Sequence, residues 1–173
     1  MTLQSFHHVA YRCTNSQETV DFYTKVLGAK LTSTVRERHP DNNEFLHVFF
    51  SLEDGSTIAF FELPECEPAV WDPNTPLWVQ HIAFNVKSSD VQVAMKTRLE
   101  ALGVEVRGPV AHTTTTSIYF LDPSGHRLEL AVMTNYDRTA AEKRAWEDLA
   151  RWNVEREQLA EHHLIGALAQ VES

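Results

Sequence analysis

The sequence is poor in cysteine, in basic residues and in long apolar runs. Its two cysteines, Cys13 and Cys66, lack CxxC spacing, which excludes a disulfide framework and indicates buried thiols in a reducing cytoplasm. No run of about 18 apolar residues occurs, and the first residues lack a charged start followed by an apolar stretch. We therefore expect neither a membrane-spanning segment nor a targeting segment.

The charge balance and the composition bound the class of protein. Fifteen Lys and Arg against 24 Asp and Glu give a formal charge of −9. Such an acidic chain repels phosphate backbones and anionic lipids, so nucleic acid and membranes are not expected as partners. Hydrophobic residues make up 43% and charged residues 23% of the 173 positions, which is ordinary for a globular protein with one compact domain.

An internal duplication is the first informative feature that is present. Residues 8–11 (HVAY) match residues 81–84 (HIAF), and each run precedes a helical stretch that closes on Leu-Gly, at Gly28 and Gly103. A glycine directly after a helix is typical of a C-terminal cap. Each copy continues with β-like runs around a turn, which predicts a hairpin. These runs are residues 29–36, 45–50 and 57–63 in the first copy and residues 104–107, 113–121 and 127–132 in the second.

The order of these elements predicts an α+β fold built from two βαβββ modules. The modules span about residues 5–64 and 78–133 and together form one domain, residues 1–134. Four prolines between positions 64 and 76 break regular structure, so residues 65–77 are expected to link the modules.

Residues 135–173 have a different composition, rich in Ala, Glu, Arg, Leu and Trp and free of proline, which predicts a helical tail. A free helix leaves its apolar side chains exposed to water. We therefore expect the tail to pack on the core or on a second subunit, and we favour a homodimer whose interface the tail helps to cover. The side chains that need cover are Trp146, Leu149, Trp152, Leu159, Leu164 and Leu168.

Two histidines and two glutamates occupy similar places in the two copies. His8 and His81 stand just inside the first predicted strand of each module, and a duplicated unit that closes face to face brings equivalent residues together. Two neutral imidazoles there make half of a divalent metal site. Glu62 and Glu129 lie among apolar residues of the last strands, where a buried carboxylate needs a partner or a metal. Because strand side chains alternate between faces, each glutamate can instead point to water.

Five motifs share the pattern of a known family: residues 8–10 (HVA), 21–23 (DFY), 26–28 (VLG), 81–83 (HIA) and 119–130 (YFLDPSGHRLEL). Over about residues 5–133 the sequence resembles the vicinal oxygen chelate superfamily, which includes glyoxalase I, fosfomycin- and bleomycin-resistance proteins and type I extradiol dioxygenases. The resemblance implies a cup-shaped mixed sheet and a divalent metal held by His8, His81 and Glu129. Glu62 falls where glyoxalase I supplies a fourth ligand. Open positions on the ion then hold two oxygens of one small-molecule substrate.

Within that family we favour an extradiol-like dioxygenase that uses Fe(II), with Ni(II), Zn(II) or Mn(II) as alternatives, on a catechol-type substrate. Tyr119 lies ten residues before Glu129, as a tyrosine does in the extradiol pattern, and His112 resembles that pattern's additional active-site histidine. His112 is closer to Tyr119 than the pattern has it, and the place of the catalytic base falls near Ser56. His47, on a neighbouring strand, is a candidate substrate-binding replacement.

Two other functions remain open. In a glyoxalase I-like lyase or isomerase, His8, Glu62, His81 and Glu129 all bind Ni(II) or Zn(II), and Arg12 matches a glutathione-contacting arginine. The residues around Cys66 and Ala111 do not reproduce that family's polar and basic groups, so glutathione itself is not expected. The third function is metal-free binding of a small molecule in the same cup.

Overall fold

The computed structural model describes residues 5–67, 69, 72–134 and 136–171, with side chains up to Arg156. The chain divides into two compact units, Met1–Met133 and Thr134–Ser173.

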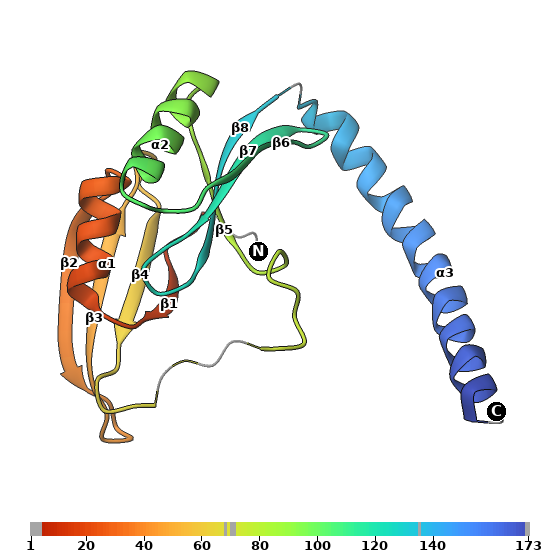
Figure 1. The fold of residues 1–173 in the computed structure, drawn as a ribbon, viewed down its shortest axis with the longest axis horizontal. Coiled ribbons are helices and arrows are strands. Elements are labelled where there is room, and N and C mark those ends of the chain that lie inside the picture. Colours follow the sequence, from red (N-terminus) through yellow and green to blue (C-terminus); the bar gives the residue numbers. More distant parts are fainter. Residues whose placement is uncertain (1–4, 68, 70–71, 135, 172–173) are drawn as a thin grey trace. The chain divides into compact units, whose positions relative to one another are not determined.

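The first module of the larger unit is a four-stranded sheet with one helical segment (Figure 1). Its sheet has the order β1-β4-β3-β2, in which β1 runs parallel to β4 and the other neighbours are antiparallel. Its elements in chain order are β1 (Val9–Cys13), α1 (Ser16–Asp21), the π-helical turn η1 (Phe22–Val26), β2 (Lys30–Arg38), β3 (Glu44–Ser51) and β4 (Thr57–Glu62).

The second module repeats this arrangement with the order β5-β8-β7-β6, and again the first and last strands are parallel. Its elements are β5 (Ile82–Asn85), α2 (Ser89–Ala101), β6 (Arg107–Ala111), β7 (Thr115–Leu121) and β8 (Arg127–Met133). The predicted α+β class with two βαβββ modules is confirmed. One predicted strand was misplaced, since residues 104–106 precede β6 and the strand runs from Arg107 to Ala111.

Local signals explain where the helices begin and end. The Asn15 side chain accepts a hydrogen bond from Glu18 N at the start of α1, and Ser88 does the same for Val91 N at the start of α2. Gly28 and Gly103 follow the helices with φ of +82° and +80°, the left-handed conformation that glycine adopts at helix ends.

The two modules share one hydrophobic core on the helix side of both sheets. Phe22 of η1 packs on Phe120 of β7 with ring centroids 6.3 Å apart, and the Tyr23 hydroxyl donates to Asp122 Oδ2 at 3.2 Å. The largest fully buried side chains include Tyr23, Phe50 and Phe60 from the first module and Leu99, Ile118 and Leu128 from the second. Because the core lies on the helix side, each sheet turns its other face, the helix-free face, away from it.

Strand alternation decides which side chains reach the helix-free faces. In β8, Leu128 and Leu130 point into the core, so Glu129 points to the helix-free face. In β3, Val48 and Phe50 point into the core, so His47 points to the helix-free face of the first sheet. The strands β1 and β5 are edge strands, each with one side unpaired among the described residues.

The smaller unit contains α3 (Arg138–Val171), so the predicted helical tail is confirmed. Trp146, Leu149 and Trp152 are 76%, 48% and 54% exposed in the chain. The other apolar tail residues, Leu159, Leu164 and Leu168, lie outside the described side chains, and their packing stays a prediction.

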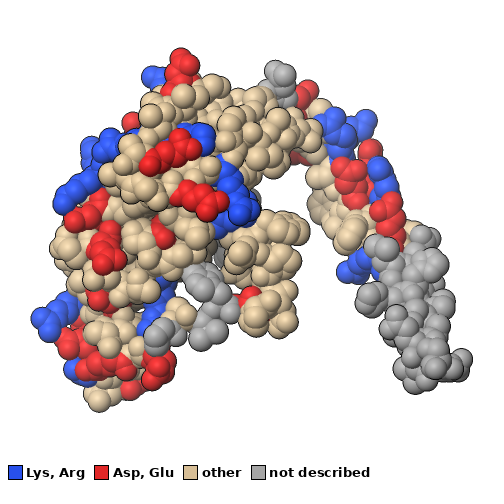
Figure 2. All heavy atoms as spheres, in the orientation of Figure 1, with Lys and Arg blue, Asp and Glu red and all other residues tan. Residues whose placement is uncertain are grey.

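Two expectations from composition can be checked on the described residues. Cys13 is buried and Cys66 is half-buried, and both are free thiols. No described helix has the length and apolar character needed to cross a bilayer. On the face that Figure 2 shows, Lys and Arg are interspersed with Asp and Glu over the larger unit instead of forming a broad basic field.

Candidate metal centre

His81 stands directly before β5, where the linker ends. A backbone hydrogen bond from Val79 N to Pro76 O (2.9 Å) forms the preceding turn. The Nδ1 atom of His81 lies 3.3 Å from the carbonyl oxygen of Val79, which can only accept, so Nδ1 is the atom that donates. Nε2 is then the ring nitrogen that can bind a metal, as in metal-binding histidines whose second nitrogen is held by a carbonyl.

Glu129, on the neighbouring strand β8, faces the His81 imidazole. Its Oε2 lies 3.0 Å from His81 Nε2, and its Oε1 accepts a hydrogen bond from the Ser117 hydroxyl at 2.5 Å. The residue is 7% exposed. Its strand position explains the placement, because Ala83 of β5 and Tyr119 of β7 are its register partners on either side.

The separation between these two donor atoms fits a bound cation. Two ligands about 2.1 Å from an ion and at right angles to each other lie about 3.0 Å apart. The described geometry has that spacing between Nε2 of His81 and Oε2 of Glu129. Either a proton or a metal ion between the two atoms satisfies both, and an imidazole with a carboxylate suits a divalent transition metal.

Tyr119 and His112 lie beside this pair. The Tyr119 ring centroid is 6.3 Å from that of His81, and His112 Nε2 is 2.7 Å from the Tyr119 hydroxyl. Burial, and then the nearby Glu129 carboxylate, raise the pKa of Tyr119, so the hydroxyl keeps its proton at neutral pH. His112 is held at the start of the β6–β7 turn by a hydrogen bond from its backbone N to Thr115 O.

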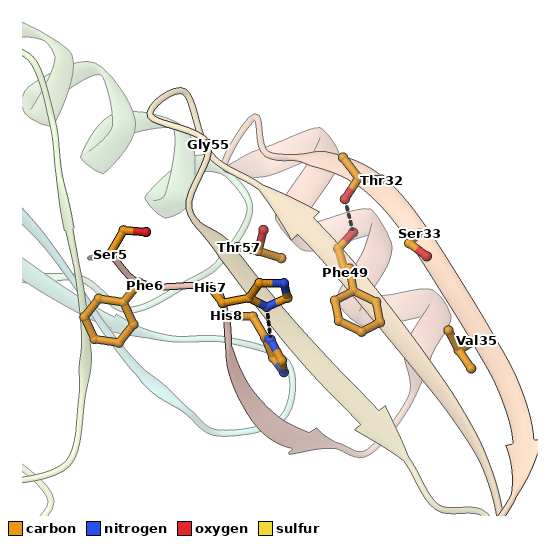
Figure 3. Close-up of a pocket in the computed structure, with 10 residues that line it drawn as sticks. All are labelled: Ser5, Phe6, His7, His8, Thr32, Ser33, Val35, Phe49, Gly55 and Thr57. Carbon is orange, nitrogen blue, oxygen red and sulfur yellow. Dashed lines mark hydrogen bonds between the residues drawn. The ribbon is translucent and has the colours of Figure 1, made fainter. Parts of the chain in front are cut away.

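His8 lies on the other sheet, directly before β1 (Figure 3). Its ring centroid is 5.8 Å from that of Phe49 and 6.3 Å from that of His47, and its Nδ1 is 2.7 Å from Nδ1 of His7. In the part of the chain that the structure describes, no three His, Cys, Asp or Glu residues are gathered so that they could hold a metal ion. In the described part of the chain, His81 and Glu129 therefore come together without His8, which lies on the first module.

A cavity of about 480 Å³ opens beside His8. Figure 3 shows His7 and His8 just before β1, with Phe49 on β3 and Thr32 on β2 of the same sheet. Aromatic, hydroxyl and imidazole groups line it, and it has no Lys or Arg among its described lining residues. These are Ser5, Phe6, His7, His8, Thr32, Ser33, Val35, Phe49, Gly55 and Thr57.

His47 is buried between aromatic rings next to this cavity. Its ring centroid is 3.5 Å from that of Phe61 and 4.0 Å from that of Phe49, and only 8% of the residue is exposed. Its Nε2 has no hydrogen-bond partner in the described part of the chain. Burial, and then the neighbouring His8, lower the pKa of His47, which favours a neutral imidazole.

Glu62 is not the counterpart of Glu129, which corrects the correspondence read from the sequence. In the strand register Ala83 pairs with Glu129, and the equivalent Ala10 pairs with Ala59. Glu62 is three residues beyond Ala59, so it points to the opposite face of the sheet. There its Oε2 accepts a hydrogen bond from Ser16 N at the start of α1 (2.9 Å), away from the face that carries His8.

Arg12 and Ser56 have local partners. The Arg12 guanidinium donates to the backbone oxygens of Leu63 (3.4 Å) and Cys66 (3.2 Å), beside a second cavity of about 360 Å³. Ser56 donates its hydroxyl to Asp54 Oδ1 (2.6 Å) within the β3–β4 turn, so it does not replace a catalytic base. The sequence analysis did not identify Ser117 or Arg127 as site residues. Arg127 could have been found, because it lies two residues before Glu129 on the same strand and therefore on the same face of the sheet.

A model of the Glyoxalase/Bleomycin resistance protein/Dioxygenase superfamily matches residues 5–130. The chain belongs to this superfamily. The match covers both modules, and it confirms the family that the sequence motifs indicated.

Three members of the superfamily illustrate its range. Metallothiol transferase FosB of Bacillus licheniformis is 30% identical over 135 residues, which are 76% of this chain and 77% of FosB. MhqA of Bacillus subtilis, named as a candidate ring-cleaving dioxygenase, is 29% identical over 133 residues, which are 75% of this chain and 40% of MhqA. The crystal structure of a glyoxalase family protein from Enterococcus faecalis is 26% identical, with a TM-score of 0.59 over 76% of this chain and 99% of that one. The superfamily is thereby established, and its members differ in their reactions.

Proposed function

We propose that the chain is a cytoplasmic, divalent-metal-dependent dioxygenase that acts on a catechol-type small molecule with Fe(II). The observation that carries this proposal is the pair His81 and Glu129, 3.0 Å apart, with the hydrogen-bonded pair Tyr119 and His112 beside it. The similarity to MhqA over the two modules supports ring cleavage as the reaction.

We further propose that the metal centre is shared between two copies of the chain. His81 and Glu129 come from the second module of one copy, and His8 comes from the first module of the other. The unpaired edges of β1 and β5 support this arrangement, because each histidine directly precedes one of these edge strands. Large apolar side chains next to the same strands, Phe6, Leu77 and Trp78, are mostly exposed in one chain and find cover in such a dimer.

A divalent metal held by His8, His81 and Glu129 would bind the oxygens of a diol and would supply the redox chemistry that dioxygen needs. The chain's own groups would orient the metal ligands and the substrate and would supply a proton. Ser117 fixes the orientation of the Glu129 carboxylate through its hydrogen bond. The Tyr119 hydroxyl, bonded to His112, provides a proton donor at the edge of the pair. Phe49 lies beside His8 in the first module, so the copy that contributes His8 also offers an aromatic wall for a substrate ring.

Two contacts disfavour the glyoxalase I-like alternative. Its fourth ligand, Glu62, is engaged at the start of α1 on the other face of the sheet. Its glutathione-contacting residue, Arg12, directs its guanidinium to the backbone oxygens of Leu63 and Cys66. A metal with three protein ligands keeps more open positions, which suits a diol together with dioxygen.

The test is metal analysis of anaerobically purified protein followed by oxygen uptake with a panel of catechols. The proposal expects iron in the purified protein and consumption of dioxygen with at least one diol. Protein that retains a divalent metal and consumes no dioxygen with any diol contradicts the dioxygenase, and protein that retains no metal favours the binding protein.

A further inference from the structure

Arg127 occupies an unusual place beside the metal centre. It begins β8 and lies two residues before Glu129, so the two side chains share the helix-free face of the second sheet. Its guanidinium carbon lies 4.4 Å from the centroid of the Tyr119 ring. The aromatic ring thus supports the guanidinium through a cation–π contact and holds it on the side where His81 and Glu129 meet.

The charge of Arg127 has no counterpart in the described part of the chain. Its Nε atom is buried without a hydrogen-bond partner, and no ion pair among the described residues includes it. The nearest carboxylate along the strand, Glu129, is engaged by His81 and Ser117. A half-buried guanidinium with an unused donor costs stability unless something pairs with it.

A second arginine near the same tyrosine shows the contrast. Arg107 of β6 is a register partner of Tyr119, and its Nε lies 3.5 Å from Glu105 Oε1. Both of those side chains are largely exposed, so water solvates them. Arg127 is the arginine that is fixed in place, half-buried and unpaired.

We propose that Arg127 binds a carboxylate substituent of the substrate, which makes a carboxylated catechol the preferred class. This inference rests on the proposed function, because the diol end of the molecule is placed at the metal centre. Side chains two residues apart on one strand face are separated by about 7 Å, roughly the length of a benzene ring with its substituents. A guanidinium presents its donors as a fork that matches a carboxylate. The cavity beside His8, on the first module, has no Lys or Arg among its described lining residues, so it supplies no competing cation.

The experiment measures equilibrium binding to the full chain loaded with Zn(II), which keeps the ligand from being oxidised. Calorimetry compares 1,2-dihydroxybenzene with 3,4-dihydroxybenzoate. The wild type is expected to bind the carboxylated diol about 10- to 100-fold more tightly, the range of one charge-assisted hydrogen-bonded pair. Arg127→Met removes most of this preference. Arg127→Lys retains part of it, because the charge stays and the fork is lost. The matched control Arg107→Met keeps the wild-type preference.

Three results would overturn the inference. The wild type binds both diols equally; Arg127→Met keeps the preference; or Arg107→Met loses as much as Arg127→Met, which identifies a general charge effect. Thermal melting of each variant tests whether it is folded. If Arg127→Met does not fold, the comparison is made with Arg127→Lys. Benzoate binding to metal-free protein separates the two proposals. If benzoate binding depends on Arg127 while neither diol binds through the metal, the metal-enzyme proposal fails and the carboxylate site stands.

Discussion

His81 Nε2 and Glu129 Oε2 lie 3.0 Å apart, with His81 Nδ1 directed to the carbonyl of Val79 and Glu129 Oε1 bonded to Ser117. Each member of the pair is therefore oriented by a contact of its own. Such prior orientation lowers the cost of binding a metal, because the ligands do not have to be ordered when the ion arrives.

The first prediction concerns which carboxylate holds the metal. Glu129→Gln and His81→Ala are expected to lose nearly all bound metal, because each removes one of the two oriented side chains that we propose as ligands. Glu62→Gln is expected to keep metal content close to that of the wild type, because Glu62 bonds Ser16 N on the opposite face. Elemental analysis of the purified variants measures this. Loss of metal in Glu62→Gln as complete as in His81→Ala contradicts the assignment.

The second prediction concerns Tyr119. Tyr119→Phe removes the hydroxyl that bonds His112 and keeps the ring that supports Arg127. We expect kcat for the diol to fall about 100-fold, the lower end of the range for losing a proton donor, while the metal content is unchanged. Oxygen-electrode kinetics with parallel metal analysis check this. A variant with wild-type kcat shows that the hydroxyl has no part in turnover.

The third prediction is a pH dependence of stability. Asp122 accepts hydrogen bonds from Ser124 N and His126 N (both 2.9 Å) and from the Tyr23 hydroxyl. Burial raises the pKa of Asp122 above its ordinary value of 3.8, although the neighbouring His126 opposes the shift. The folded state therefore holds this proton more tightly than the unfolded state. The resulting stabilisation is complete below about pH 3.8 and is lost as the pH rises through the folded pKa.

Asp122→Asn keeps an acceptor for the turn and carries no charge, so the comparison isolates this effect. We expect the unfolding free energy of the wild type, relative to Asp122→Asn, to fall as the pH rises above about 4 and through the raised pKa of Asp122. Asp122→Ala, the control, loses the turn contacts and is expected to be less stable than Asp122→Asn by about 1–3 kcal/mol at every pH. Urea unfolding monitored by tryptophan fluorescence gives the three curves. If the unfolding free energy of the wild type minus that of Asp122→Asn rises with pH, the sign is opposite to the prediction and the explanation is wrong.

The fourth prediction concerns the tail. Because residues 1–133 form a compact unit with their own core, a chain that ends after Met133 is expected to fold. Trp146, Leu149 and Trp152 are exposed in one chain, and we expect the truncated protein to dimerise less tightly than the full chain. Light scattering over a concentration series measures the change. A truncated chain with unchanged dimer mass and melting temperature shows that the tail neither contributes to the dimer interface nor stabilises the fold.

Much of the fold could be predicted from the sequence, because the modules are duplicated and their turns carry Gly28 and Gly103 at helix ends. The direction of the Glu62 side chain could not be predicted, because a strand glutamate among apolar neighbours can find water or a hydrogen-bond partner on either face of the sheet. Only the register, with Ala59 opposite Ala10, decides it. The separation of His8 from His81 was also beyond the pattern, because pseudo-symmetry predicts that equivalent residues meet without saying whether they meet within one chain or between two.

The shared metal centre is tested most directly by mixing two defective chains. His8→Ala and Glu129→Ala are each expected to lack metal and oxygen uptake alone. In a two-fold dimer that shares its sites, a mixed pair contains one site with His8, His81 and Glu129 all intact, so random mixing restores about one quarter of the wild-type sites. The measurement is bound iron and diol-dependent oxygen uptake after the two variants are co-refolded, with mass analysis to show that mixed dimers form. Recovery to about that level is the predicted result, and mixed dimers with no recovered iron or uptake contradict the shared centre.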